Sequence, residues 1–124
     1  MGAANIVETV MGRRIQLPET LLARFPELER VDWRRGGVPV MIAGLFLRSA
    51  AAITLWQTVF LSSTALLEAE LLLHEFRHVQ QFETDVTFPL RYLWESARRG
   101  YFANRYEVDA REYAAQRLRG KGSN

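Results

Sequence analysis

One segment near the middle of the chain constrains the fold more than any other. It spans residues 71–82 and reads Leu-Leu-Leu-His-Glu-Phe-Arg-His-Val-Gln-Gln-Phe. It contains His74 and His78, the only two histidines in the sequence. Residues four apart on an α-helix lie on one face, one turn above the other. The spacing therefore predicts a helix from about residue 65 to about residue 82, with both imidazoles on the same side.

The residues around this segment support the predicted helix. Ser62, Ser63 and Thr64 come just before it and offer side-chain oxygens for an N-cap. Glu68 and Glu70 follow in the early turns, where negative charge is favourable beside the positive end of the helix dipole. We therefore expect the helix to begin directly after Thr64.

The two histidines form a pair suited to holding a metal ion. Imidazoles at that separation can reach one zinc ion at zinc–nitrogen distances of about 2.0–2.1 Å. Glu75 is rotated by about 100° around the helix, so we expect it to flank the ion, where a general base for a zinc-bound water is needed. The alternative is that His74 and His78 are ordinary half-buried helix residues and Glu75 is solvent-exposed. The combination of all three residues favours zinc.

A catalytic zinc ion takes a third protein ligand and keeps one position open for water. The chain has no cysteine and no further histidine, so we expect a carboxylate. Glu107 shares one face of a C-terminal helix with Ala110 and Ala114, whose small side chains would let that helix approach the histidines closely. Glu107 is thus the predicted third ligand.

Two alternatives to this ligand remain open from the sequence. Asn104 could cap the C-terminal helix, with Glu107 at the third helical position reaching back to it in a capping box. Asp109 and Glu112 are backup ligands. Glu112 lies about 140° around the helix from Glu107, so the two cannot point at the same ion.

The motifs resemble those of a known class of enzymes. His74-Glu75-Phe76-Arg77-His78 resembles the HExxH motif of the zincin metallopeptidases, and Glu107-Val108-Asp109-Ala110 is similar to the Glu-x-x-Ala segment of the gluzincins. The layout also resembles the minimal zincin-like domain associated with contractile injection systems and bacterial toxins. There a strand of Ile-Thr-Leu character precedes a Leu-Leu-x-His-Glu-x-x-His-Val-x-Gln helix, and Ile53–Leu55 and Leu72–Gln80 fit that pattern. The resemblance covers roughly residues 50–116.

This resemblance implies zinc held by His74, His78 and Glu107, with Glu75 as general base and acid in peptide-bond hydrolysis. The chain departs from the gluzincins at Arg111, where many of them have an aspartate that orients a histidine. Arg111 could pair with Glu107 or Glu75, or bind a substrate carboxylate. The candidates for stabilising the oxyanion are Tyr101, Tyr106, Tyr113 and Arg111.

The predicted function is zinc-dependent hydrolysis of a peptide or protein substrate, which could add to the predicted strand 52–61 as an extra strand. The alternative is a zinc-stabilised binding or scaffold domain without turnover, or one that needs a partner protein to complete its cleft. A basic-surface binder using Arg98, Arg99 and residues 117–121 is the third interpretation. It is less favoured because acidic residues alternate with the basic ones, so nucleic acid is not an expected partner.

The rest of the pattern predicts one α+β domain over residues 1–124, of minimal zincin-like architecture. A small antiparallel or mixed sheet would pack on the HExxH helix and on the C-terminal glutamate-bearing helix. The expected elements are a flexible segment 1–16, a short helix from Pro18 to Phe25, a turn at Gly36-Gly37, buried strands at 38–47 and 52–61, helices from Pro89 to Gly100 and from Asn104 to about Leu118, and a disordered tail 119–124.

Membrane insertion and secretion are not expected. The longest apolar stretch, residues 38–61, is interrupted by Arg48, Ser49 and Gln57 and falls short of a membrane span. Residues 1–14 lack the apolar core of a secretory signal. The expected location is therefore the cytoplasm, with non-classical export as the alternative.

Overall fold

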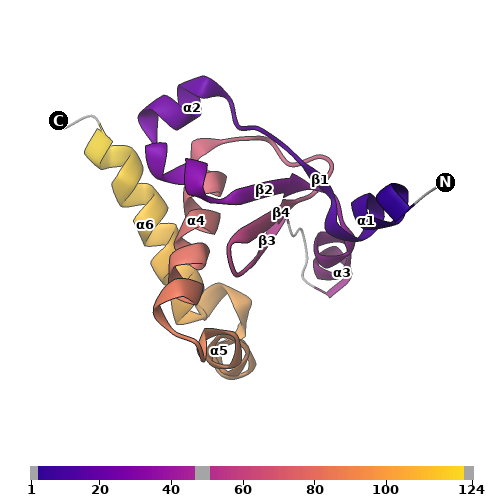
Figure 1. Cartoon of the computed structure of the whole chain (residues 1–124). Helices are drawn as coiled ribbons and strands as arrows, with labels where there is room; N and C mark the ends of the chain where they lie inside the picture. The colour runs from indigo at the N-terminus through magenta and orange to yellow at the C-terminus, as the bar shows by residue number, and fades with distance from the viewer. Residues whose placement is uncertain (1–2, 47–50, 122–124) are drawn as a thin grey trace. The chain divides into compact units, whose positions relative to one another are not determined.

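The computed structural model describes residues 3–46 and 51–121 of the chain. These residues form six α-helices and a mixed four-stranded sheet (Figure 1), which confirms the predicted α+β class. The chain divides into two compact units, residues 1–67 and residues 68–124. The sheet belongs to the first unit and the HExxH segment to the second. The expectation of a single domain stays a prediction.

The sheet of the first unit has the strand order β1-β2-β4-β3. Strands β1 (Arg13–Arg14) and β2 (Asp32–Arg35) are antiparallel, β2 and β4 (Thr58–Leu61) are parallel, and β4 and β3 (Ala52–Leu55) are antiparallel. Trp33 of β2 lies opposite Val59 of β4, and both are buried. The Trp33 indole donates a hydrogen bond of 2.7 Å to the Leu28 carbonyl, so its polar edge is satisfied within the core.

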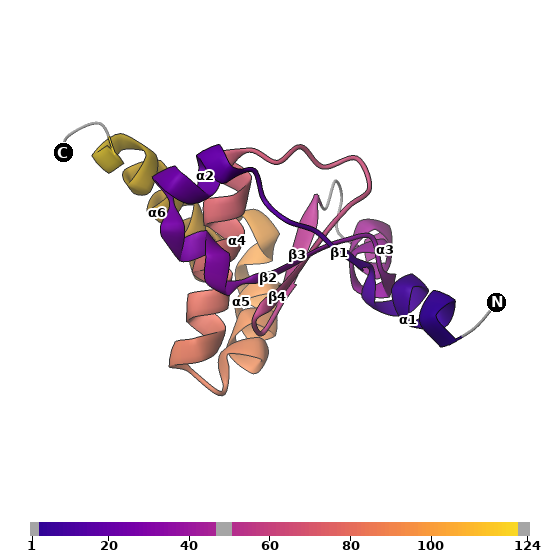
Figure 2. The same ribbon diagram turned by 45° about the horizontal axis from the view of Figure 1, so that its top comes forward.

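The prediction of one continuous strand over residues 52–61 is wrong. The segment is a hairpin in which β3 and β4 lie side by side (Figure 2), joined by a turn at Trp56 and Gln57. Trp56 adopts a positive φ of 55°, a conformation that two-residue hairpin turns require and usually assign to Gly or Asn. Because the turn lacks either residue, the sequence carries no hairpin signal. Of the two halves, only β3 is an edge strand.

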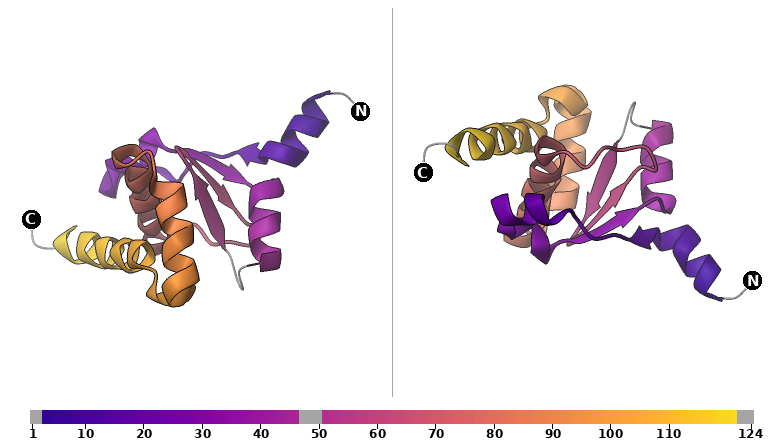
Figure 3. Two further views of the ribbon diagram at one scale, coloured as in Figure 1. Left: turned by 90° about the horizontal axis from the view of Figure 1, so that it is seen from below. Right: turned by 90° about the horizontal axis from the view of Figure 1, so that it is seen from above.

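The prediction of a buried strand over residues 38–47 is also wrong. Residues Val38–Phe46 form helix α3, which packs on β3 and β4 (Figure 3). A short, uniformly apolar run cannot be assigned to strand or helix by periodicity alone. Pro39 lies in the first turn of α3, where its missing N–H costs no hydrogen bond. Arg48 and Ser49 lie outside the described residues.

The predicted turn at Gly36-Gly37 is confirmed, and both residues have positive φ. A Cβ on Gly12 would lie 2.7 Å from the Gly36 carbonyl oxygen, and one on Gly37 would lie 2.9 Å from the Gly12 nitrogen. This close approach joins the start of α3 to the end of helix α1 (Ala3–Met11). Helix α1 thus occupies part of the segment 1–16 for which flexibility is expected, that expectation stays a prediction, and residues 1–2 lie outside the description.

Two short elements complete the first unit. Helix α2 (Glu19–Arg24) follows Pro18, as predicted. A 3₁₀ helix over Pro26–Arg30 then leads into β2 and buries Leu28 beside Phe25 of the core.

The second unit contains α4 (Ala69–Thr84), α5 (Phe88–Ala103) and α6 (Arg105–Lys121). Helix α4 begins four residues later than predicted, after Glu68, and no side chain caps it. The expected cap from the Ser62–Thr64 run is therefore wrong. Helix α6 packs along α4 (Figure 1), with Ala110 and Ala114 fully buried as expected from their small size.

The end of α5 and the start of α6 follow the predicted signals. Gly100 interrupts α5 with a φ of 80° and a ψ of 167°. The Asn104 side chain accepts a 2.8 Å hydrogen bond from the Tyr106 backbone N–H at the start of α6, so Asn104 is the predicted N-cap. Helix α6 continues to Lys121, three residues beyond the predicted end at about Leu118, and the disorder expected for 119–124 stays a prediction. Residues 122–124 lie outside the description.

Within the described ranges, the structure has no helix that combines the length and the apolar character needed to cross a membrane.

Candidate metal centre

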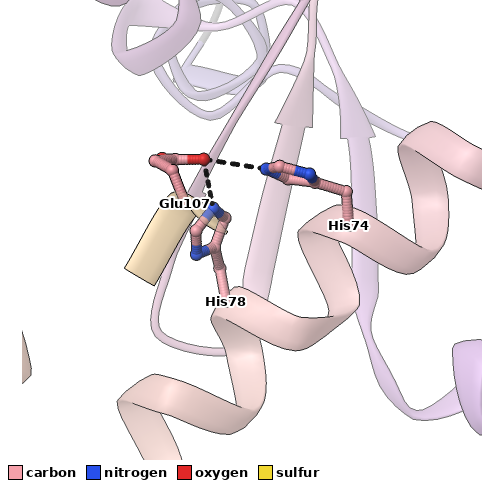
Figure 4. A group of neighbouring side chains, drawn as sticks. All are labelled: His74, His78 and Glu107. Carbon is pink, nitrogen blue, oxygen red and sulfur yellow. Dashed lines mark hydrogen bonds and ion pairs between the residues drawn. The ribbon is translucent and has the colours of Figure 1, made fainter. Parts of the chain in front are cut away.

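Three of the predicted site residues converge in the second unit. His74 and His78 project from successive turns of α4, and Glu107 projects towards them from the first turn of α6 (Figure 4). Glu107 Oε1 lies 2.8 Å from His74 Nε2 and 3.1 Å from His78 Nε2. One potential ligand atom from each residue lies within 4.8 Å of those from the other two. The geometry is that of a candidate metal centre.

Helix packing directs Glu107 into this position. Ala110 and Ala114 lie one and two turns further along α6, and both are buried where α6 packs on α4. Side chains at i, i+3 and i+7 share a helix face, so Glu107 faces α4 with them. It is only 3% exposed. The capping-box alternative for Glu107 is therefore wrong, because its carboxylate meets the histidines and Asn104 caps α6 with its own side chain.

Glu107 has a third hydrogen-bond donor that the sequence analysis missed. The Tyr92 hydroxyl, on α5, donates a hydrogen bond of 2.5 Å to Glu107 Oε2. Burial would raise the pKa of Glu107, but the hydrogen bonds from His74, His78 and Tyr92 outweigh it and hold that pKa well below its usual range. The only signal for Tyr92 was its helical spacing from Phe88, which is buried on the same side of α5.

His78 is the most constrained of the three residues. Its Nε2 faces Glu107, and its Nδ1 lies 2.7 Å from Gln81 Oε1. Burial by itself would lower the pKa of His78. The hydrogen bond to Glu107 and the negative charges of Glu75 and Glu107 outweigh burial and raise this pKa to about 9. Without a metal, His78 is thus a cation paired with a buried carboxylate.

Glu75 is buried beside the site, with 7% of its surface exposed. Its charge contributes to raising the pKa values of His78, Tyr92 and Tyr101. The alternative in which Glu75 is simply solvent-exposed is therefore wrong. A carboxylate held here, next to but not within the His74–His78–Glu107 cluster, can accept a proton from a group bound to the cluster.

The backup ligands lie elsewhere. Asp109 pairs with Arg77, with 2.8 Å between Oδ2 and Nε, and also accepts a hydrogen bond from Gln81. Glu112 is exposed on α6. The Arg111 guanidinium lies 4.3 Å from the centre of the Phe102 ring and donates to the Phe102 carbonyl.

The four candidates for oxyanion stabilisation differ in their surroundings. Tyr106 packs against Phe88 and Arg105, and Tyr113 packs against Phe76 and Arg77.

Tyr101 is half-exposed after the Gly100 break. Burial of its hydroxyl and the charges of Glu107 and Glu75 raise its pKa above the usual range. Tyr101 is therefore a candidate whose hydroxyl pKa depends on the charges of Glu107 and Glu75.

The predicted basic patch at Arg98 and Arg99 surrounds an acidic residue. Glu95 is buried, and Arg98, Arg99 and Arg105 lie 3.5–3.9 Å from its carboxylate. Part of the positive charge of this patch is thus neutralised within the unit.

Comparisons with protein-family models, with curated proteins and with solved structures found no match to this chain.

Proposed function

We propose that this chain is a zinc-dependent hydrolase of peptide bonds, with zinc held by His74, His78 and Glu107. The observation that carries the proposal is the convergence of two imidazole nitrogens and one carboxylate oxygen from two packed helices. Neutral imidazole and carboxylate are ligands that zinc takes in catalytic sites. The choice of a peptide as substrate rests on the resemblance of the two motifs to those of the zincins.

The distances are compatible with an ion of this size. Ligand atoms about 2.1 Å from a tetrahedral zinc lie roughly 3.4 Å from one another. The two histidine nitrogens now lie 2.8 Å and 3.1 Å from Glu107 Oε1. Zinc binding therefore requires Glu107 Oε1 to lie only roughly 0.3–0.6 Å further from the two nitrogens, and the ligand atoms of all three residues lie within 4.8 Å of one another.

The number of ligands favours a catalytic site over a structural one. Structural zinc is closed by four protein ligands, whereas catalytic zinc has three and leaves one position for water or substrate. Among the described residues, the cluster has three members. Bound here, zinc would lower the pKa of a water molecule and polarise the carbonyl of the scissile bond.

The neighbouring side chains supply the remaining roles. Glu75 would take the proton of the attacking water and pass it to the leaving amine. Tyr101 would donate a hydrogen bond to the oxyanion, because its hydroxyl pKa depends on the charges of Glu107 and Glu75 and the residue remains half-exposed. Tyr92 would hold the second oxygen of Glu107 and so orient the third ligand.

A zinc-stabilised domain without turnover is the second candidate. The low exposure of the cluster favours it, since the side chains of His74, His78 and Glu107 are 16%, 8% and 4% exposed. In this case zinc would stabilise the packing of α4 on α6, and a partner protein would be needed to form a substrate cleft.

The first test is the metal content of the wild type and of His78→Ala, each purified without added metal. We expect about one zinc per wild-type chain and none in the variant. Absence of zinc from both, even after incubation with excess metal, would contradict the proposal.

The second test separates the two candidates. Wild type and Glu75→Gln, both loaded with zinc, are screened against a broad peptide library. Loss of the general base should reduce cleavage by about 10²–10⁴-fold without loss of zinc. Bound zinc with no cleavage by the wild type would favour the domain without turnover. Equal cleavage by both proteins would exclude the role of Glu75.

A further inference from the structure

Gln81 connects the candidate metal centre to a polar network on the outer side of α4. It follows His78 by three residues, so the two side chains are neighbours on the helix. It is 9% exposed, and its side chain makes three hydrogen bonds. A glutamine buried in this way is held in one orientation only if its amide oxygen and nitrogen have different partners.

The partners of the amide nitrogen determine that orientation. Gln81 Nε2 donates to the Tyr106 carbonyl at 3.0 Å and to Asp109 Oδ2 at 2.9 Å. A carbonyl and a carboxylate can only accept hydrogen bonds. A flipped amide would direct its oxygen at two acceptors, and both of them would lose the hydrogen bond that Gln81 donates. The nitrogen must therefore face Tyr106 and Asp109, and the oxygen must face His78.

This orientation selects one tautomer of His78. Gln81 Oε1 lies 2.7 Å from His78 Nδ1 and can only accept, so Nδ1 must carry a proton. In the neutral imidazole, the lone pair is then on Nε2, the nitrogen that faces Glu107. Nε2 is the atom that the proposed zinc site requires as its ligand.

The outer end of the network is also anchored. Asp109 Oδ2 accepts a hydrogen bond of 2.8 Å from Arg77 Nε. Arg77 also donates a hydrogen bond of 3.0 Å to the Gln80 side chain. The chain of hydrogen bonds therefore runs from Arg77 through Asp109 and Gln81 to His78.

We propose that Gln81, anchored by Asp109, is a positioning residue that holds His78 in the Nδ1–H tautomer with Nε2 directed at the metal. The proposal rests on the proposed zinc site. Loss of such an outer partner typically weakens metal binding by about 10–100-fold. Gln81 touches neither the metal nor the substrate in this proposal and acts only through His78.

The first test uses Gln81→Met, which keeps the length of the side chain but removes its hydrogen bonds. Gln116→Met is the matched control, since Gln116 is exposed on α6. Zinc affinity is measured by competition with a chelator of known affinity, and circular dichroism compares the folds. We expect zinc affinity to fall by about 10–100-fold in Gln81→Met and to be unchanged in the control. Unchanged affinity in both variants would overturn the proposal.

A second readout does not depend on zinc. In the metal-free protein with ¹⁵N-labelled histidine, only two imidazoles contribute signals. We expect a protected Nδ1–H signal from His78 in the wild type and in Gln116→Met, and its loss in Gln81→Met. Persistence of this signal in Gln81→Met would contradict the role of Gln81. If the wild type binds no zinc, this spectrum still tests the positioning of His78 separately from the zinc site.

Exchange of the two polar groups provides a test if Gln81→Met does not fold. Gln81→Glu keeps an acceptor for His78 but opposes the Asp109 carboxylate. Adding Asp109→Asn restores a donor between the two positions. We expect the double variant to bind zinc more tightly than Gln81→Glu alone. If the double variant binds zinc no more tightly than Gln81→Glu alone, this result would count against the network.

Discussion

Two buried glutamates in the second unit have opposite surroundings. Glu107 and Glu95 are 3% and 4% exposed. Glu107 meets two imidazoles and the Tyr92 hydroxyl at 2.5–3.1 Å. Glu95 lies 3.5–3.9 Å from three arginine side chains that are each more than half exposed.

The two sets of partners differ in whether they can lose a proton and bind a metal ion instead. Guanidinium groups stay protonated at all ordinary pH values and have no lone pair to offer a metal. Imidazoles can give up a proton and become ligands. Glu95 is therefore suited to a structural role, and Glu107 to a site where a metal replaces a proton. Four predictions test this comparison.

The largest expected effect is on zinc affinity. Glu107→Gln removes the charged ligand, and we expect a loss of at least about 100-fold, since it exceeds the loss of an outer partner. Glu95→Gln changes the same functional group outside the cluster and should bind zinc like the wild type. Chelator competition measures both. Equal affinities in the two variants would break the comparison.

The next effect is on the stability of the metal-free protein. Glu107→Gln deprives the buried His78 cation of its partner, and we expect a loss of about 3 kcal/mol in the free energy of unfolding. Glu95→Gln should cost less than about 1 kcal/mol, because its arginine partners are exposed to solvent. Urea unfolding at pH 6 measures both. A larger loss in Glu95→Gln would reverse the assignment of roles.

The pH of the measurement matters because the pKa of His78 is raised from 6.5 to about 9 in the folded chain. A group whose pKa rises on folding stabilises the protein fully below its unfolded value. That stabilisation is lost as the pH rises from 6.5 through 9. The stability difference between wild type and Glu107→Gln should accordingly shrink over this range.

Zinc binding should depend on pH in the opposite direction. Below pH 9 the metal must displace one proton from His78, so the apparent affinity should rise by about tenfold per pH unit up to about pH 9. Glu107 stays ionised over this range because its pKa is lowered, and it adds no slope. The same slope is expected in Glu95→Gln. Zinc titrations between pH 6 and pH 9 would refute this if affinity were constant.

The smallest expected effect is that of salt. Added salt should weaken the ion pairs between Glu95 and its exposed arginine partners and leave the contacts of Glu107 with its buried partners almost unchanged. The stability cost of Glu95→Gln should therefore decrease by a few tenths of a kcal/mol at most in high salt. The cost of Glu107→Gln should stay constant. Urea unfolding at low and high sodium chloride compares them, and equal salt sensitivity would argue against the role of the partners' exposure.

The accuracy of sequence-based prediction differs between the two units. In the second unit, the HExxH helix, the break at Gly100 and the cap at Asn104 were predicted, because each depends on side chains close together in sequence. In the first unit, residues 38–46 and 52–61 were misassigned. The first is an apolar run without a decisive period, and the second turns at Trp56, whose residue type does not signal a turn.

Within the site, the i, i+4 spacing was enough to place His74 and His78 on one face of a helix, and elimination pointed to a carboxylate as their partner. The spacing could not decide between a capping role and a histidine-facing role for Glu107. The spacing also gave no reason to select Tyr92. It did not indicate that Asp109, a backup ligand in the prediction, is the partner of Arg77 and Gln81.

The sequence by itself thus determined the candidate site residues and the helix on which the histidines lie. The tertiary structure decided which residues meet them. His74 and Glu107 are separated by 33 positions, and local preferences do not set the rotation of one helix against another. Packing of Ala110 and Ala114 against α4 sets that rotation, because buried small residues let the two helices approach and so direct Glu107 at the histidines.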